Sequence, residues 1–92
     1  MTRYQIAFTQ EFKRDYKKIQ RRRLKVAKLK IVVELLANDE TLPEKFRDHA
    51  LAGKWNGARE CHIAPDWLLI YMKTDERLIL TLMRTGTHSD LF

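Results

Sequence analysis

The sequence is poor in the residues that cross-link or interrupt a chain, with one cysteine, two prolines and three glycines among 92 residues. A lone cysteine excludes an internal disulfide, and Cys61 lies among apolar neighbours, so we expect a buried, inert thiol in a reducing cytoplasm. No apolar run approaches the length of a membrane span, and Met1 leads directly into a polar segment, so we expect neither a membrane anchor nor a signal peptide. No Cys/His spacing has the form of a zinc site. We therefore expect no metal and no small-molecule cofactor.

Positive charge is concentrated in one stretch. The chain has a net charge of +6, and ten of its eighteen lysine and arginine residues fall between Lys13 and Lys30, where the only acid is Asp15. This stretch, the basic block, favours a polyanionic partner, either nucleic acid or an acidic protein. The alternative is a basic helix face that is simply solvated.

The hydrophobic content of 45% over 92 residues is typical of a folded protein with one modest core. We expect residues 1–92 to form one domain without linkers or repeats. The segment Arg3 to Phe8 (RYQIAF) alternates like a strand, and Thr9 is placed to cap the helix that follows. In that helix the apolar residues recur at helical spacing, at Phe12, Tyr16 and Ile19.

A second helix is predicted from Leu24 to Ala37, after a joint at Gln20–Arg23. It is apolar on more than one side, so it is either well buried or has a face that a partner covers. The segment from Glu40 to Gly53 is predicted to be a loop.

From Lys54 onward the pattern has a period of two. The predicted segments are a strand through Ile63, a turn at Pro65–Asp66, a central strand at Trp67–Lys73, a hairpin connection at Lys73–Arg77 and a last strand at Leu78–Met83. The order is one strand, two helices and a three-stranded antiparallel meander. This predicts a small α+β domain with the helices packed on one face of the sheet.

Polar side chains follow the predicted strands. Glu60 and His62 share one face of a strand, Asp66 lies at the turn, His88 ends the last strand and His49 precedes the sheet. An apolar sheet has little need for a glutamate and a histidine on one face unless that face is wet. We expect these groups to converge on the face that the helices leave open.

Strict alternation along the last strand would point Arg84 toward the core, on the same side as Leu80 and Leu82. A bulge or a strand end must release it if it is to reach the open face. It then either forms an ion pair with a carboxylate or binds a phosphate.

This combination suits cleavage of RNA, which supplies its own nucleophile, the 2′-hydroxyl. The protein must add a proton acceptor, a donor for the leaving 5′-oxygen, and cations around the transition state. Histidine, Asp/Glu and arginine are sufficient. Trp67 and Phe92 are candidates for stacking on bases, although Trp67 also suits the core.

Two segments carry a resemblance to a known family. DHALAGKWNGARECHIAPDWLLIY (Asp48 to Tyr71) and RTGTHSDLF (Arg84 to Phe92) resemble the YafQ-type toxins of the RelE/ParE superfamily, through the patterns KDHxLxGxWxGxR…H…PDWxLIY and RTGTHxxLF. The first half matches only in its basic helix–helix character. The resemblance implies the toxin of a toxin–antitoxin pair, acting in the cytoplasm as a ribosome-dependent mRNA endonuclease without a metal.

The family's functional positions fall on residues of the expected type: His49, His62, Asp66, Trp67, Arg84, His88 and Phe92. One acidic position departs from the pattern, because the chain has Glu60 where the family has aspartate. The resemblance implies that His88 is a general acid or base and that Arg84 stabilises transition-state charge. His49, His62 and Asp66 would accept a proton or position the 2′-hydroxyl, and Glu60 is a further catalytic candidate.

The expected partners are a cognate antitoxin, the ribosomal A site with its rRNA, and mRNA. The side chains expected to contact RNA phosphates are those of Lys13, Lys17, Lys18, Arg21, Arg22, Arg23 and Lys25. Two rival functions are a ParE-like gyrase inhibitor, for which the three histidines have no evident use, and a non-catalytic RNA-binding or antitoxin-binding module.

Overall fold

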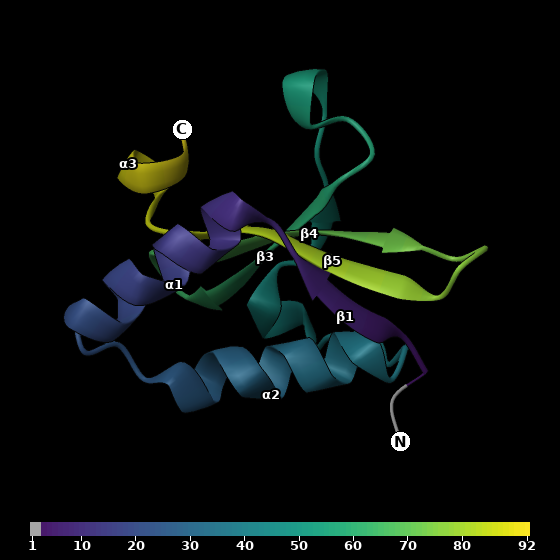
Figure 1. The fold of residues 1–92 in the computed structure, drawn as a ribbon, viewed down its shortest axis with the longest axis horizontal. Helices are drawn as coiled ribbons and strands as arrows, with labels where there is room; N and C mark the ends of the chain where they lie inside the picture. The colour runs from purple at the N-terminus through teal and green to yellow at the C-terminus, as the bar shows by residue number, and fades with distance from the viewer. Residues whose placement is uncertain (1–2) are drawn as a thin grey trace.

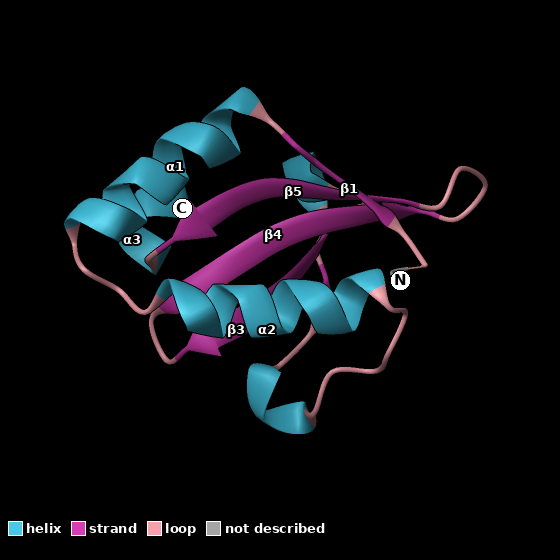
Figure 2. Cartoon of the chain, turned by 60° about the horizontal axis from the view of Figure 1, so that its bottom comes forward, coloured by secondary structure: helices cyan, strands magenta, loops and turns pink. Residues whose placement is uncertain are grey.

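The computed structural model describes residues 3–92, which form a five-stranded sheet with helices against both of its faces (Figures 1 and 2). The strand order is β1-β5-β4-β3-β2, with β1 parallel to β5 and the other neighbours antiparallel. The elements are β1 (Gln5–Phe8), α1 (Gln10–Arg21), α2 (Val26–Ala37), the 3₁₀ turn η1 (Glu44–Phe46), β2 (His49–Ala50), the 3₁₀ turn η2 (Gly53–Trp55), β3 (Arg59–Ala64), β4 (Trp67–Thr74), β5 (Ile79–Gly86) and α3 (His88–Leu91). This confirms the predicted α+β class with α1 and α2 on one face of the sheet. The short helix α3, which was not predicted, lies against the other face.

The first helix begins where the sequence indicates. The Thr9 hydroxyl accepts a hydrogen bond from the backbone N–H of Phe12 at 3.0 Å, as an N-cap does. The second helix starts at Val26, two residues later than predicted, because Arg23 has a left-handed backbone (φ 57°) and Lys25 is extended. Both helices cover the same face of the sheet, where they enclose the larger core with Leu69, Leu80 and Leu82.

The strand β4 lies between β5 and β3 and is buried on both faces, as its apolar sequence predicts. Its odd-numbered residues from Trp67 to Tyr71 face α1 and α2, while Leu68 and Ile70 face the opposite side with Leu91. We call that opposite side the open face, since only α3 and the 51–58 segment partly cover it. No helix within residues 3–92 is long and apolar enough to cross a membrane.

The strand predicted from Lys54 begins only at Arg59, because Gly53–Trp55 forms the 3₁₀ turn η2. Two further segments differ from the prediction. His49–Ala50 was expected in a loop but forms the edge strand β2, in which His49 lies opposite Glu60. His88 was expected to end the last strand, but β5 stops at Gly86 and His88 is the first residue of α3. Both errors arise from pairings that local periodicity does not contain: a two-residue strand has no period, and the α3 turn depends on capping by Thr87.

The predicted release of Arg84 is confirmed. In the pairing of β4 with β5, Ile70 lies opposite Arg84 and Tyr71 lies opposite Leu82, so Met83 is an extra residue. This bulge moves Arg84 from the core side to the side of Ile70. The RTGTH segment therefore begins on the open face.

Candidate active site

Glu60 is the centre of a group of polar side chains on the open face. Its side chain is only 6% exposed, and its Oε1 lies 3.5 Å from Nε2 of His49 and 3.7 Å from Nε2 of His62. β2 and β3 set this arrangement, because His49 is paired with Glu60 across the strands and His62 follows on the same face. The predicted convergence of these three residues is confirmed.

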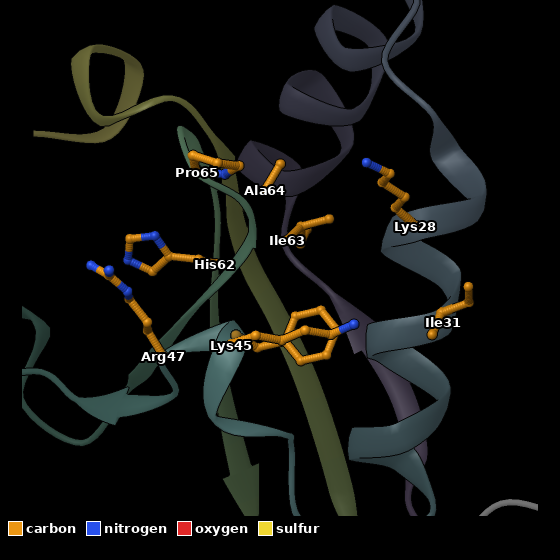
Figure 3. A pocket seen from close by; sticks show the side chains of 9 residues that line it. Lys28, Ile31, Lys45, Arg47, His62, Ile63, Ala64 and Pro65 are labelled. Carbon is orange, nitrogen blue, oxygen red and sulfur yellow. The ribbon is translucent and has the colours of Figure 1, made fainter.

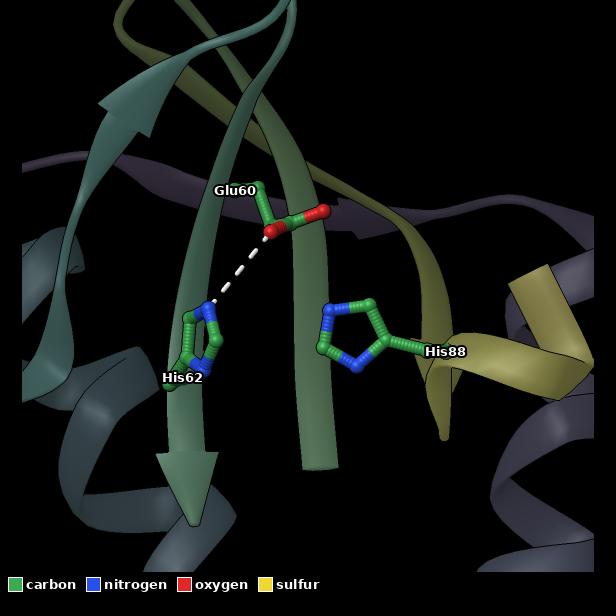
Figure 4. Close-up of side chains that lie close together, drawn as sticks. All are labelled: Glu60, His62 and His88. Atoms are coloured by element: carbon green, nitrogen blue, oxygen red, sulfur yellow. Dashed lines mark ion pairs between the residues drawn. The ribbon is translucent and has the colours of Figure 1, made fainter. Parts of the chain in front are cut away.

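His88 approaches the same group from α3, on the other side of β4 (Figure 4). Its Nδ1 and its backbone N–H lie 3.1 and 3.2 Å from Oδ1 of Asp66, respectively. A carboxylate only accepts hydrogen bonds, so Nδ1 carries the proton in this contact and Nε2 is left for proton transfer. The side-chain hydrogen bond from His88, followed by the backbone one, lowers the pKa of the exposed Asp66. Asp66 therefore orients His88.

The rings of His62 and His88 face one another at a centroid distance of 5.8 Å and an interplanar angle of 60°. Phe92 is 61% exposed and its ring centroid lies 6.4 Å from that of His88. Figure 4 shows Glu60 beside the space between the two imidazoles. Two histidines and a carboxylate thus border one small volume, with an accessible aromatic ring next to it.

Asp48, the residue before His49, is a second carboxylate with partners of its own. Asp48 accepts hydrogen bonds from the Tyr71 hydroxyl and from Arg59, with the Arg59 Nη2 at 3.1 Å. Burial, together with the hydrogen bond to Asp48, raises the pKa of Tyr71, so its hydroxyl remains a donor. Nδ1 of His49 lies 2.7 Å from the carbonyl oxygen of Arg47 and donates to it. The carbonyl of Arg47 therefore orients the His49 ring.

Arg84 is engaged by a carboxylate rather than pointing freely into the site. Its Nε and Nη2 lie 2.6 and 3.1 Å from the two carboxylate oxygens of Asp15, which is 4% exposed. The same carboxylate accepts the backbone N–H of Thr85 at 3.1 Å. Because β1 ends before this point, Asp15 satisfies a donor on the edge of β5 that no strand covers.

The prediction that Trp67 stacks on RNA bases is wrong. Trp67 is 4% exposed in the core beneath α1 and α2, and its Nε1 donates to the hydroxyl of Thr85 at 2.9 Å. A ring with both faces covered has no surface for a base. The alternation of side chains along β4 already indicated this burial, since Trp67 shares a face with Leu69 and Tyr71.

The short helix α3, which carries His88, is fastened to α1. Nη1 and Nη2 of Arg22 lie 2.7 and 3.1 Å from the two carboxylate oxygens of Asp90. Asp90 also accepts the backbone N–H of Thr87 at 2.9 Å, which completes a capping box. The Arg22 hydrogen bond, followed by that from Thr87, holds the pKa of Asp90 well below its usual range.

The basic block is a largely exposed surface on α1 and the start of α2. Among residues 3–92, Arg22 is the member of the block that forms a salt bridge, and Lys13 lies over the ring of Phe8 at 5.5 Å. The exposed members predicted to contact RNA that form no salt bridge within this range are Lys13, Lys17, Lys18, Arg21, Arg23 and Lys25. Charge is thus available for a polyanion.

Cys61 takes no part in the site. It is fully buried in the core under the helices, and burial raises the pKa of its thiol to about 12. An undissociated thiol is a poor nucleophile. This confirms the predicted inert cysteine.

One nitrogen each of His62 and His88 and one oxygen of Glu60 lie within 4.8 Å of one another. Imidazole and carboxylate are ligands that zinc and copper accept, and this separation would need only a modest contraction for the three to share an ion. The expectation of no metal rested on the absence of a zinc-type spacing in the sequence. These ligands come together only in three dimensions.

Several residues that shape the site were missed from the sequence: Asp15, Arg22 as a clamp, Arg47, Asp48 and Asp90. Asp15 had a signal, because it is the only acid in the basic block and lies on the apolar stripe of its helix. Arg22 and Asp90 pair across 68 positions, and Asp48 pairs with Arg59 and Tyr71 across 11 and 23 positions, so local spacing does not indicate these contacts.

The fold and site together define a small α+β protein whose imidazoles and carboxylates suit proton transfer at a phosphodiester. A family model described as "Bacterial toxin of type II toxin-antitoxin system, YafQ" matches residues 4–92. The mRNA interferase toxin YafQ of Escherichia coli K12 is 41% identical over 93 residues, covering 100% of this chain and 99% of that protein.

Solved structures agree with this match. The E. coli DinJ–YafQ toxin–antitoxin complex contains a chain with a TM-score of 0.89 and 41% identity, covering 98% of each chain. A metal-bound toxin from Helicobacter pylori has a TM-score of 0.91 and 36% identity over 100% of each chain. The chain belongs to the YafQ family of bacterial toxins of type II toxin–antitoxin systems, and it is an endoribonuclease.

Proposed function

We propose that this toxin cleaves messenger RNA in the A site of the bacterial ribosome, in the cytoplasm, by attack of the RNA's own 2′-hydroxyl. The observation that carries the proposal is the pair of histidines His62 and His88, whose ring centroids lie 5.8 Å apart. His62 lies beside Glu60, and His88 is oriented by Asp66. In the proposed reaction the acid and the base act on opposite sides of the scissile phosphate, and these two imidazoles are assigned those two roles.

The reaction forms a bond from the 2′-oxygen to phosphorus and breaks the bond from phosphorus to the 5′-oxygen. His62, with the Glu60 carboxylate beside it, takes the one proton of the 2′-hydroxyl. His88 gives a proton from Nε2 to the leaving 5′-oxygen, and Asp66 stabilises the imidazolium that precedes this transfer. The chain's own groups account for both proton transfers, so no metal is assigned a step.

The test uses mRNA on programmed ribosomes in single-turnover conditions, with wild type, His88→Ala and His62→Ala. A positioned proton-transfer group contributes roughly 10²–10⁴-fold, so each variant should lose about that much rate. Replacing the 5′-oxygen by sulfur provides a leaving group that needs no general acid. This substrate should restore much of the rate of His88→Ala and none of that of His62→Ala.

Unchanged cleavage by His88→Ala would contradict the proposal. Restoration of His62→Ala alone by the sulfur substrate would exchange the two roles. Arrest of translation without a cut would favour a non-catalytic binder, and intact translation with inhibited supercoiling would favour a gyrase inhibitor.

The basic block supports docking on the ribosome, because phosphate contacts position a protein without reading sequence. Arg21, Arg23 and Lys25 are exposed and form no salt bridge within residues 3–92. Reversing these three charges should weaken ribosome binding and flatten its salt dependence. Reversing Arg22 is a poor test, since it also releases Asp90 and α3.

An apolar groove of about 690 Å³ between β1, α1 and α2 supports an antitoxin site. Ile6 and Phe8 are 40% and 52% exposed there, and lysines including Lys13 and Lys30 border it. An amphipathic antitoxin segment with acidic flanks would complement both features. A similar chain, YafQ of E. coli, is found in a complex with the antitoxin DinJ. Phe8→Lys should weaken binding of the cognate antitoxin without lowering RNA cleavage.

The metal-bound H. pylori toxin supports one further proposal for the active site. The Glu60, His62 and His88 ligand set fits a zinc or copper ion. Such an ion would occupy the imidazole lone pairs that the proton transfers need. We propose that it inhibits cleavage rather than assists it.

A further inference from the structure

A cavity next to His62 leads away from the site between α2, η1 and the end of β3 (Figure 3). Its volume of about 540 Å³ is in the range of small-ligand sites, roughly 300–1,000 Å³. Apolar side chains including Phe46 and Ile63 form part of its wall. Three cations also line it: Lys28, Lys45 and Arg47.

The charge of this cavity is uncompensated. Its lining contains no carboxylate among residues 3–92, and none of the three cations forms a salt bridge within that range. Lys45 instead lies over the ring of Phe46 at 5.1 Å. An anion entering the cavity would therefore meet cations that have no protein partner to give up.

Arg47 is the cation nearest the reacting groups. Figure 3 shows its side chain running alongside that of His62. Its backbone is left-handed (φ 49°), and its carbonyl oxygen accepts the hydrogen bond from His49 at 2.7 Å. One residue thus orients an active-site histidine with its backbone and places a guanidinium beside another. Arg84, by contrast, is occupied by Asp15.

We infer that this cavity is the subsite for the nucleotide adjoining the scissile phosphate, and that Arg47 binds that nucleotide's backbone phosphate. The inference rests on the proposed RNA cleavage and adds a substrate-binding cation to it. A guanidinium pairs with phosphate oxygens through two parallel hydrogen bonds, which lysine does not reproduce. The apolar wall suits the ribose and base of the same nucleotide.

The test is a double-mutant cycle between the protein and the RNA on programmed ribosomes. Arg47→Asn removes the guanidinium but keeps the carbonyl that holds His49, and asparagine tolerates a left-handed backbone. Messenger RNAs carry one neutral methylphosphonate, either just 5′ or just 3′ of the scissile phosphate. Arg77→Asn, in the exposed β4–β5 turn, is the matched control.

With ordinary mRNA at subsaturating toxin, Arg47→Asn should cleave about tenfold more slowly, the size expected for a charge-assisted hydrogen bond. Wild type should lose a similar factor when one of the two flanking phosphates is neutralised. Arg47→Asn should lose nothing further at that position, and Arg77→Asn should respond as wild type does. The inference would be overturned if the losses of cleavage rate caused by Arg47→Asn and by the methylphosphonate multiply at both positions.

Failure of the proposed function is distinguishable. If wild type cuts no RNA, the proposed cleavage fails, and the same cycle is read as equilibrium binding of the RNAs to free protein. Coupling between Arg47 and one phosphate would then still support the subsite. Independent effects would overturn it.

Discussion

The guanidinium of Arg84 is held by the carboxylate of Asp15, with Nε 2.6 Å from one oxygen and Nη2 3.1 Å from the other. Asp15 is the only acid in the basic block. The contact joins α1 to the end of β5, just after the β-bulge and shortly before His88 in the sequence. The arginine for which the family resemblance implies a role at the transition state thus also anchors the strand that leads to His88.

Replacing Asp15 should destabilise the fold. Asp15→Asn leaves Arg84 without its partner in a site where Asp15 is 4% exposed, and breaking such a pair from one side costs about 3 kcal/mol. Urea denaturation measures the free energy of unfolding. Glu76→Gln, in the exposed β4–β5 turn, should stay within about 0.5 kcal/mol of wild type. An Asp15→Asn protein as stable as Glu76→Gln would show that the pair contributes nothing.

A methyl group at Gly86 should disturb α3. A Cβ there would lie 2.8 Å from the Asp90 Oδ2, and the backbone φ is +155°. Asp90 has little freedom to move, because Arg22 and the Thr87 N–H both bind it. Gly86→Ala should lose about 1–2 kcal/mol and more than about tenfold in cleavage rate, since a small displacement of His88 is costly.

Gly53→Ala is the control for this substitution. Gly53 also has a positive φ, +66°, but a Cβ there meets nothing within 4 Å, so this variant reports backbone strain alone. It should lose stability but retain cleavage. If Gly86→Ala and Gly53→Ala behave alike in both measurements, contact with Asp90 is not the cause.

Acid should weaken the attachment of α3 to α1. The pKa of Asp90 is lowered on folding by Arg22 and Thr87, so its contribution to stability is fully present above the unfolded-state pKa of about 4 and is lost as the pH falls below that value. Asp90→Asn should cost about 1–2 kcal/mol at about pH 7. At about pH 3 the difference from wild type should shrink. A difference that urea denaturation finds constant between these two pH values would contradict the assignment.

Zinc should bind at Glu60, His62 and His88 and inhibit. The ion would be held by one nitrogen of each imidazole and one oxygen of the carboxylate. Zinc should raise the melting temperature of wild type and lower its RNA cleavage rate. Both effects should disappear when a chelator removes the zinc. His62→Gln should lose the thermal shift, and magnesium, which prefers oxygen ligands, should not produce it. A melting temperature that zinc leaves unchanged in wild type would rule out the site.

Much of the site was predictable because its parts are local. The alternation of β3 places Glu60 and His62 on one face, and a turn at Pro65–Asp66 brings β4 beside them. The parity of Arg84 required a bulge, and the bulge is present at Met83. The prediction for Trp67 was wrong. The family motif favoured contact with RNA, whereas the alternation of β4 places Trp67 on the core side with Leu69 and Tyr71.

The sequence by itself determined the order of elements, the faces of the strands and the basic block, because these follow from spacing along one segment. Tertiary structure decided which charges are paired. Asp15 reaches Arg84 across 69 positions and Asp90 reaches Arg22 across 68, whereas Arg47 forms no salt bridge within residues 3–92 although it lies beside His62. Spacing says nothing about such contacts, because a side chain's partner is set by packing between elements and not by its neighbours in the chain.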